Sequence, residues 1–440
     1  MRIAVIGSGI SGNAAAWALS RRHDVTLYER RKRPGGHSVT VDVDCDGEPI
    51  AVDTGFIVFN ENNYPTLTRL FNQLGVAGER SDMSFSVSLD SGRFEWCGRT
   101  WLSLFAQRRN LFSPGFLMML GDIVRFNSLA KRDLESGALC GMSFGDYMDR
   151  RGFSSRLRDA YIVPLTAAIW STPAARMLDF PAESLVRFLD NHRLIHLRRP
   201  AWRTVRGGSR NYVRKLLGDY RGRLLLDREV VAVSRDHAGV TIRDRSGNAA
   251  RYDAVVFACH SDETLRLLSD PTQEEREILG AVQFKTNVAW LHRDPALMPK
   301  RKAAWASWNY IGSSRQLGDR NLSVTYWMNL LQNIDRRHPL FVTLNPPQPP
   351  RDELVVRTFR FGHPQFDAAA LAAQLRLPSI QGVRNTWFCG AWTRYGFHED
   401  GLVSGLEVAT RLGSPPLWIG EAGGRAQVGR ARLEATGTLP

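Results

Sequence analysis

The sequence lacks the cysteine pattern of a disulfide framework or a zinc site. Its cysteines are odd in number, widely spaced and without a C-x-x-C pair: Cys45, Cys97, Cys140, Cys259 and Cys389. This pattern favours a reducing compartment, so we expect a cytoplasmic protein. The sequence also has no apolar run of the roughly 20 residues that cross a bilayer, and no signal-peptide pattern at its start. We therefore expect neither a membrane span nor secretion.

Signatures of zinc fingers and RNA-binding modules are absent as well, although the net charge is +14. We therefore expect no nucleic-acid partner. A strongly basic balance favours anionic partners, among them phosphorylated or carboxylate substrates and an anionic membrane surface. The length of 440 residues predicts two or three domains, and a hydrophobic content of 43% is enough for a large core.

The first 29 residues predict a strand, a tight turn, a helix and a second strand. Residues 1–6 and 24–28 are the strands, and the turn between them has the pattern G-x-G-x-x-G. The three glycines serve a tight turn, close approach of a pyrophosphate and close helix packing, in that order. A helix N-terminus supplies N–H groups to phosphate, and an acid at the tip of the second strand binds ribose. The residues predicted to bind a dinucleotide are Gly7, Gly9, Ile10, Ser11, Gly12 and Glu29.

A basic turn and a second glycine pair follow the acid. The segment E-R-R-K-R-P-G-G-H at 29–37 resembles the extended FAD fingerprint of the flavin-containing amine oxidase and phytoene desaturase superfamily. The resemblance implies that further cofactor contacts come from Arg30, Arg31, Gly35, Gly36 and His37. One departure is His37, which stands where those families often have arginine.

Two later segments extend the resemblance. An Asp-x-Gly segment that approaches the flavin in the amine oxidase families is matched by Asp53 and Gly55, with Phe56 beside them. The segments 386–392 and 396–405 resemble the C-terminal flavin motif, which implies contacts from Gly390, Asp400, Gly401 and Leu402. Val230 stands where the family often contacts adenine through its backbone. The cysteine motif that tethers flavin covalently is missing, so we expect non-covalent FAD.

This resemblance implies an α/β (α+β overall) fold in which a Rossmann-like FAD-binding domain is assembled from separate segments. We assign residues 1–75, 201–270 and 381–415 to that domain, and residues 76–200 and 271–380 to an inserted substrate domain of mixed sheet and helices. Residues 416–440, rich in Gly, Pro, Arg and Ala, are expected to form a loose tail.

Catalytic residues are hard to identify because a flavin carries the hydride chemistry itself. His398 and Glu399 lie inside the flavin motif and are candidates for an acid or base, the alternative being that this cluster caps a helix. Lys285 is a candidate because amine oxidases often hold a water with a lysine; the alternative is a lysine at a surface or strand edge. No metal site is predicted.

Aromatic residues of the flavin motif and of two alternating segments are candidates for the substrate pocket. These are Trp392, Tyr395, Trp308 and Trp327, with packing in the core as the alternative for each. The stretch 111–126 is apolar, rich in methionine and flanked by arginine. It predicts either a helix at a membrane surface or a buried helix of the substrate domain.

Within the superfamily, the segments 326–333 (YWMNLLQN), 341–346 (FVTLNP) and 396–401 (GFHEDG) resemble a bacterial group of predicted NAD/FAD-binding amine oxidoreductases. That group is associated with the modification of unsaturated fatty acyl chains, including by methyltransferases similar to cyclopropane-fatty-acid synthase. The resemblance implies an FAD-dependent oxidoreductase that oxidises or desaturates a fatty acyl chain of a membrane lipid. Its implied partners are that lipid, the inner face of the membrane and an acyl-modifying methyltransferase.

Two alternatives remain open. The first is an amine oxidase that yields aldehyde, ammonia and hydrogen peroxide. The second is a flavin-binding or lipid-binding protein without turnover.

Overall fold

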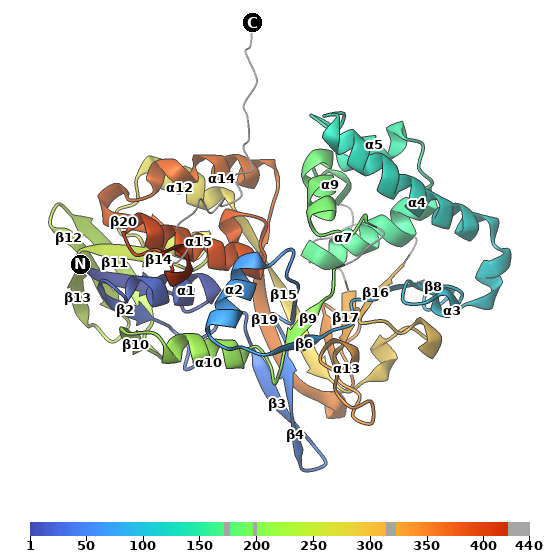
Figure 1. The fold of residues 1–440 in the computed structure, drawn as a ribbon, viewed down its shortest axis with the longest axis horizontal. Helices are drawn as coiled ribbons and strands as arrows, with labels where there is room; N and C mark the ends of the chain where they lie inside the picture. The colour runs from blue at the N-terminus through green and yellow to red at the C-terminus, as the bar shows by residue number, and fades with distance from the viewer. Residues whose placement is uncertain (171–176, 197–199, 314–322, 421–440) are drawn as a thin grey trace, which may run out of the picture.

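The computed structural model describes residues 1–170, 177–196, 200–313 and 323–420. Two large sheets organise these residues (Figure 1). The parallel sheet lies on the left of Figure 1, near the label N, and the seven-stranded sheet lies toward the centre of the picture. The predicted α/β fold class is therefore confirmed.

The parallel sheet has five strands in the order β10-β2-β1-β14-β20. Its strands are β1 (Arg2–Ile6), β2 (Asp24–Tyr28), β10 (Arg223–Leu225), β14 (Ala254–Phe257) and β20 (Thr386–Phe388). Every neighbouring pair is parallel, and the central strands are buried because both faces are covered. Ile3 and Val5 pack with the helices of one face, while Ala4 and Ile6 pack with the elements of the other.

Four helices cover the first face: α1 (Ile10–Leu19), α2 (Pro65–Gln73), α10 (Arg210–Gly218) and α15 (His398–Arg411). The second face carries the antiparallel strands β11 (Val230–Asp236), β12 (Gly239–Asp244) and β13 (Ala249–Tyr252), with the helices α11 (Ser261–Leu267), α12 (Gln273–Ala281) and α14 (Ala368–Ile380). Helices α1 and α15 cross closely, since a Cβ on Gly405 would lie 2.2 Å from the Ser11 carbonyl oxygen.

The second sheet has the order β19-β15-β18-β17-β16-β7-β8 and is mixed, because only β16 and β7 pair in parallel. Its strands are β7 (Phe85–Leu89), β8 (Phe94–Cys97), β15 (Gln283–His292), β16 (Trp308–Gly312), β17 (Ser323–Trp327), β18 (Phe341–Leu344) and β19 (Val355–Gln365). The long β15–β19 ribbon lies between the parallel sheet and the rest of this sheet (Figure 1).

Helices pack against this sheet at the side away from the N-terminus. They include α3 (Trp101–Leu104), η1 (Arg108–Phe112), α4 (Pro114–Glu135), α5 (Phe144–Arg150), α6 (Ser155–Leu157), η2 (Arg158–Ile162), α7 (Val163–Trp170) and α9 (Ala182–Asn191). Short elements complete the described chain: β3 (Thr40–Cys45), β4 (Glu48–Asp53), β5 (Val58–Phe59), β6 (Gly78–Arg80), β9 (Arg203–Val205), α13 (Met328–Leu331), α16 (Leu417–Gly420) and the 3₁₀ turns η3 (Pro295–Leu297), η4 (Lys302–Ala304), η5 (Asp352–Leu354), η6 (Val383–Asn385) and η7 (Ala391–Thr393).

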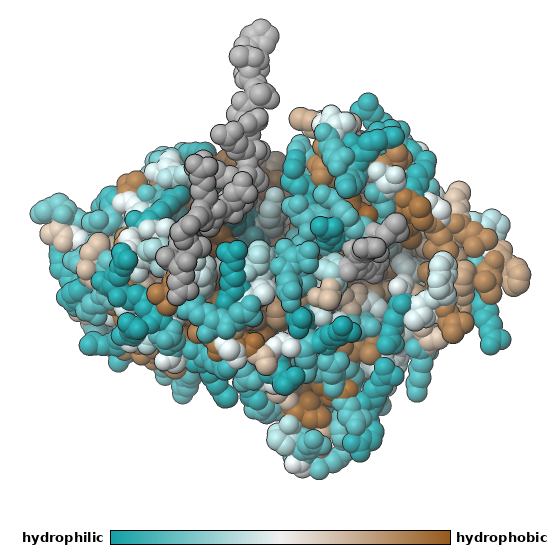
Figure 2. Space-filling model, viewed as in Figure 1, coloured by the Kyte–Doolittle hydropathy of each residue, from teal (hydrophilic) through white to brown (hydrophobic). Residues whose placement is uncertain are grey.

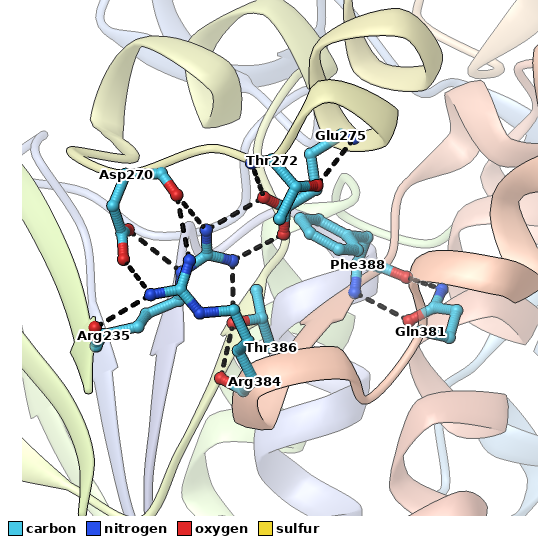
Figure 3. A network of polar contacts seen from close by, with 8 residues as sticks. All are labelled: Arg235, Asp270, Thr272, Glu275, Gln381, Arg384, Thr386 and Phe388. Atoms are coloured by element: carbon cyan, nitrogen blue, oxygen red, sulfur yellow. Dashed lines mark hydrogen bonds and ion pairs between the residues drawn. The ribbon is translucent and has the colours of Figure 1, made fainter. Parts of the chain in front are cut away.

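A buried ion pair ties the second face together (Figure 3). Arg235 on β11 donates to both carboxylate oxygens of Glu275 on α12, at 2.5 and 2.9 Å, and neither side chain is more than 1% exposed. Arg235 also contacts Asp270 and the Thr386 hydroxyl, so it links α12 to the edge strand β20. A buried charge is stable only when it is paired in this way.

The segments expected to form separate domains supply the two large sheets separately, whereas the small sheet β5-β9-β6 takes strands from both sets. Residues 1–75, 201–270 and 381–415 provide every strand of the parallel sheet, and the seven-stranded sheet draws its strands from 76–200 and 271–380. At the start of the expected loose tail 416–440, α16 brings Trp418 onto Trp17, with ring centroids 5.9 Å apart, so this part is helical and packed. Residues 421–440 lie outside the described residues. Among the described helices, none is long and apolar enough to span a membrane.

Candidate active site

A cavity of about 970 Å³ lies between the two sheets. Its lining comes from the carboxyl ends of the parallel strands, from the β15–β19 ribbon and from helices α7 and α9. Ligands of open parallel sheets bind at the carboxyl ends of the strands. The cavity therefore lies where the first glycine turn predicts a dinucleotide.

The first glycine turn leaves room for a phosphate at the start of α1. A Cβ on Gly9 would have no atom within 4 Å, whereas a Cβ on Gly12 would lie 1.8 Å from the Gly7 carbonyl oxygen. Gly9 lines the cavity and precedes the first turn of α1, which no described side chain caps. Uncapped N–H groups and the positive end of the helix dipole suit an anionic group.

The second glycine pair packs directly on the first turn. Gly36 has a φ of +56°, and a Cβ there would lie 2.8 Å from the Gly9 Cα. The next residue, His37, lines the cavity, and its buried Nε2 has no partner among the described residues. An unpaired buried nitrogen facing a cavity fits contact with a bound group.

Glu29 lies at the tip of β2, as predicted for a ribose-binding acid. Its Oε2 accepts from the Ser8 amide at 3.0 Å and its Oε1 from the Arg31 amide at 2.9 Å, which fixes the carboxylate at the cavity wall. Oε2 also accepts from the Ser8 hydroxyl at 2.6 Å, so Oε1 is the oxygen that retains a lone pair for a ribose hydroxyl. Val230, Arg30 and Arg31 line the same end of the cavity.

In the Asp-x-Gly segment, Asp53 anchors the loop and Gly55 lines the cavity. Asp53 is fully buried and accepts hydrogen bonds from Ser209, Thr40 and Gln332, so it anchors the loop and does not line the cavity. Burial raises the pKa of Asp53 to about 6. Gly55 does line the cavity, and a Cβ there would lie 2.0 Å from the His37 carbonyl oxygen. The two loops can lie this close only with glycine at position 55.

The histidine of the C-terminal motif lines the cavity. His398 stacks on Phe56 with centroids 3.8 Å apart, and its Nε2 lies 2.7 Å from the Tyr212 hydroxyl. Burial lowers the pKa of His398 to about 3, so the ring is neutral. A neutral ring with such a low pKa is a weak base. The contacts with Phe56 and Tyr212 hold the ring in place, so His398 forms part of the cavity wall.

The acids that follow His398 serve other contacts. Glu399 accepts from the amides of Thr66 and Leu67 at 2.8 and 2.9 Å, and so caps α2. Asp400 accepts from the Phe397 amide at 2.9 Å. Gly401 packs on Ile10 at the α1–α15 crossing. Neither Glu399 nor Asp400 lines the cavity, and the catalytic role predicted for Glu399 gains no geometric support.

The predicted aromatic pocket residues divide into two groups. Trp308 and Trp392 line the cavity, and Trp308 packs edge-on against Tyr326, which lines it too. Tyr395 is 40% exposed and Trp327 packs on Trp305; neither lines the cavity. For Trp327, packing in the core is the alternative that the structure favours.

Lys285 is not among the residues that line the cavity, although Phe284 and Thr286 on either side of it are. It pairs across the β15–β19 ribbon with His363, which does line the cavity. The structure therefore places the Lys285 backbone beside the site and leaves its predicted role in catalysis as a prediction.

Sequence reasoning missed a group of rings on the ribbon and at the start of α11. His37 lies 5.0 Å from Phe361 and 5.8 Å from His363 between ring centroids, and His260 stacks on Phe284 at 4.2 Å. Gly362 makes room for this packing, since a Cβ there would lie 2.7 Å from His260 Cε1. The segment 361–363, F-G-H, was the available signal, because a glycine inside a strand marks a close approach.

The cysteines near the site are poor candidates for a covalent link to flavin. Cys259 lines the cavity, but burial raises the pKa of its thiol to about 12 and its sulfur lies 3.2 Å from the Thr264 hydroxyl. Cys389 is fully buried and does not line the cavity. Both thiols remain protonated at neutral pH, which fits non-covalent FAD.

Fold and cavity together define the class of dinucleotide-binding flavoprotein oxidoreductases. The family described as flavin containing amine oxidoreductase matches residues 10–289, and the chain belongs to this family. No curated protein sequence matches it. The protein is an FAD-dependent oxidoreductase that binds FAD non-covalently.

Solved structures share the fold at low sequence identity. Putrescine oxidase bound to putrescine has a TM-score of 0.66 and 15% identity, over 94% of this chain and 99% of that one. A CLA-producing fatty acid isomerase from P. acnes has a TM-score of 0.65 and 14% identity, over 93% and 98%. A putative protoporphyrinogen oxidase from Exiguobacterium sp. 255-15 has a TM-score of 0.63 and 15% identity, over 93% and 98%.

Proposed function

We propose that the protein oxidises or desaturates a fatty acyl chain of a membrane lipid, one that is unsaturated or carries a methyl modification. When bound, FAD accepts the hydride, and the chain's own residues bind the acyl chain, orient it and exclude water. The named neighbours include an enzyme of fatty acids as well as an enzyme of amines, so the fold alone leaves the substrate open.

The chemistry of the cavity wall carries the proposal. The described lining residues from 76–200 and 271–380 are mostly aliphatic or aromatic and none is a carboxylate: examples are Met83, Phe85, Trp96, Tyr161, Leu165, Ile169, Phe188, Trp308, Tyr326 and Leu344. The lining carboxylates Glu29, Glu229, Asp262 and Glu263 all come from the segments assigned to the FAD-binding domain. Moving a protonated amine from water to this wall is costly in free energy, because the wall has no counter-charge for it. An acyl chain loses no hydrogen bonds there and gains the hydrophobic term.

The histidines at this wall are uncharged as well. Burial lowers the pKa of His192 and His363 to about 4, and that of His398 to about 3. At neutral pH the part of the wall from residues 76–200 and 271–380 therefore carries neither a positive imidazolium nor a carboxylate, and its described lining residues include the cation of Arg360. A wall with a cation and without a carboxylate supports an apolar substrate over the alternative of an amine.

Mass spectrometry of lipid products tests the proposal. The protein would be incubated with phospholipids that bear unsaturated or methyl-branched chains, and with amines in parallel, in the presence of oxygen. We expect an acyl chain that is lighter by two hydrogens and no aldehyde from the amines. Unchanged lipid together with aldehyde and hydrogen peroxide from an amine would refute the proposal in favour of amine oxidation.

Leu165 offers a control inside the cavity wall. Leu165→Glu introduces a carboxylate at the wall, and Leu165→Met keeps the wall apolar with a similar volume. We expect the first variant to lose the acyl product while it still binds FAD, and the second to retain the product. Equal activity of the two variants would contradict an apolar substrate at this wall.

A further inference from the structure

A cluster of large apolar side chains is exposed at the end of the molecule farthest from the parallel sheet. We call it the apolar tip and define it by Trp101, Leu102, Phe112, Leu117, Met118 and Val124. Three of its members are almost fully exposed: Trp101 at 82%, Leu102 at 88% and Phe112 at 86%. Figure 2 shows hydrophobic residues gathered over the region that α3 and α4 occupy in Figure 1.

The two sides of α4 explain how the tip arises. Phe116, Met119 and Phe126 are fully buried and pack into the core of the substrate side. Leu117 and Val124 are exposed and lie seven residues apart, so they share the outer stripe of the helix. The first half of the helix, up to Val124, therefore also exposes apolar side chains to solvent, which is unusual for a surface helix and marks a contact site.

The charges around the tip have one sign. Residues 98–126 contain four arginines and a single acid, Asp122, which is buried and paired with Arg125 at 3.1 Å. Arg108 and Arg109 on η1 are exposed, and neither forms an ion pair with any described residue. Lys302, on the turn η4 that packs against α3, is exposed too. Exposed apolar side chains close to basic groups that form no ion pair among the described residues suit an anionic lipid surface.

The cavity reaches close to the tip along the chain. Trp96 on β8 and the exposed residue Gly98 both line the cavity, and Trp101 follows three residues after Gly98. The strand β8 thus connects the apolar wall of the cavity to the first helix of the tip.

We propose that the apolar tip docks on the surface of an anionic lipid bilayer. Trp101, Leu102 and Phe112 insert at the boundary between headgroups and acyl chains, while Arg108 and Arg109 contact lipid phosphates. The docking rests on the tip itself. A consequence that also rests on the proposed function is that the acyl chain passes from the bilayer to the cavity on the side of Gly98.

Vesicle sedimentation of the FAD-bound protein tests the docking. Leu102→Glu places a charge at the tip, and Leu375→Glu makes the same change at a residue that is 66% exposed on α14, outside the tip. With vesicles of phosphatidylcholine and phosphatidylglycerol, we expect Leu102→Glu to weaken binding about tenfold or more and Leu375→Glu to bind as the parent does. Equal binding by the two variants would overturn the proposal.

The basic residues are tested with the lipid charge. Replacing Arg108 and Arg109 by glutamine should weaken binding to the anionic vesicles about 25-fold, at about fivefold for each arginine. Binding of the parent protein should fall with added salt and with vesicles of phosphatidylcholine alone. Binding that ignores both lipid charge and salt would contradict the assigned role of these arginines.

Two further results separate the possible occupants of the tip. The first is that the parent protein is a dimer without lipid, that Leu102→Glu makes it monomeric, and that neither binds vesicles. In that case the tip is an interface between two copies, and the proposal is wrong. A water-soluble short-chain acyl substrate separates docking from catalysis. Turnover of it by both parent and Leu102→Glu, with vesicle lipid turned over by the parent alone, supports the docking. Turnover of it without any vesicle binding would leave the proposed function standing and overturn the docking.

Discussion

A valine at position 9 should abolish FAD binding and leave the folded apoprotein intact. Gly9 has φ −67° and ψ −178°, an extended conformation that any residue adopts, and a Cβ there would meet no protein atom within 4 Å. The free energy of unfolding of the apoprotein should therefore change by no more than about 1 kcal/mol. The added methyl groups would occupy the space through which a phosphate approaches the first turn of α1.

The expected loss of affinity follows from the contacts that the valine blocks. A hydrogen bond from an amide to a charged phosphate contributes about 1.5–3 kcal/mol, so the loss of two weakens FAD by at least about 100-fold. Flavin fluorescence during titration of the apoprotein measures the affinity, and urea unfolding measures the stability. Unchanged FAD affinity, or an unfolded apoprotein, would refute the assignment of this turn.

Gly12→Ala is the matched control. Its Cβ would lie 1.8 Å from the Gly7 carbonyl oxygen and 3.0 Å from the Ala258 Cβ. We expect the apoprotein itself to lose about 3 kcal/mol of stability, because helix α1 must move away from the sheet. The change at Gly9 should thus lower FAD affinity and spare the stability of the apoprotein, whereas the change at Gly12 should lower that stability.

Two further predictions concern stability. Glu275→Ala leaves Arg235 buried without its main partner and should lower the free energy of unfolding, measured in urea, by about 3–5 kcal/mol. The double variant Arg235→Met, Glu275→Leu should lower it by less, because no unpaired charge remains. Equal losses would contradict the account of this pair. The fully buried His292 has its pKa lowered to about 4 by burial, so the unfolded chain binds its proton more tightly and stability falls as the pH drops below about 6.5. Between pH 7.5 and 5.5 this one residue should remove about 1.3 kcal/mol, and His292→Gln should lose that part of the pH dependence; an unchanged dependence would contradict a neutral His292.

The parts of the fold that local sequence determines could be predicted. The strand, glycine turn and helix of the first 29 residues lie together in space, and each glycine has a local steric reason, such as the contact between Gly12 and Gly7. The predictions of FAD, of the fold class and of an oxidoreductase began from this local pattern, and they are confirmed.

Roles that depend on distant contacts could not be predicted. Glu399 caps α2 through amides more than 300 residues earlier in the chain, and no local pattern near Glu399 signals that use. Tyr212 meets His398 across 186 residues. For Lys285, the strand was recognisable, but the path of the cavity around the β15–β19 ribbon depends on the packing of both domains.

The stretch 111–126 shows a limit of another kind. Its composition left a helix at a membrane surface and a buried helix as alternatives, and α4 has both buried and exposed apolar side chains, with Phe116 buried and Leu117 exposed. Trp101 and Leu102 lie outside that stretch and belong to the same exposed cluster. Hydropathy alone does not separate the two faces when both are apolar.

The measurement that tests the central claim most directly is an anaerobic absorption spectrum of the FAD-bound protein. Phospholipids with unsaturated or methyl-branched chains and a panel of amines would be added separately. We predict that the flavin band bleaches with lipid and persists with every amine, because the described lining residues from 76–200 and 271–380 offer no carboxylate to an ammonium group. Bleaching by an amine alone would contradict the account, and a flavin that neither substrate reduces would contradict turnover of either class.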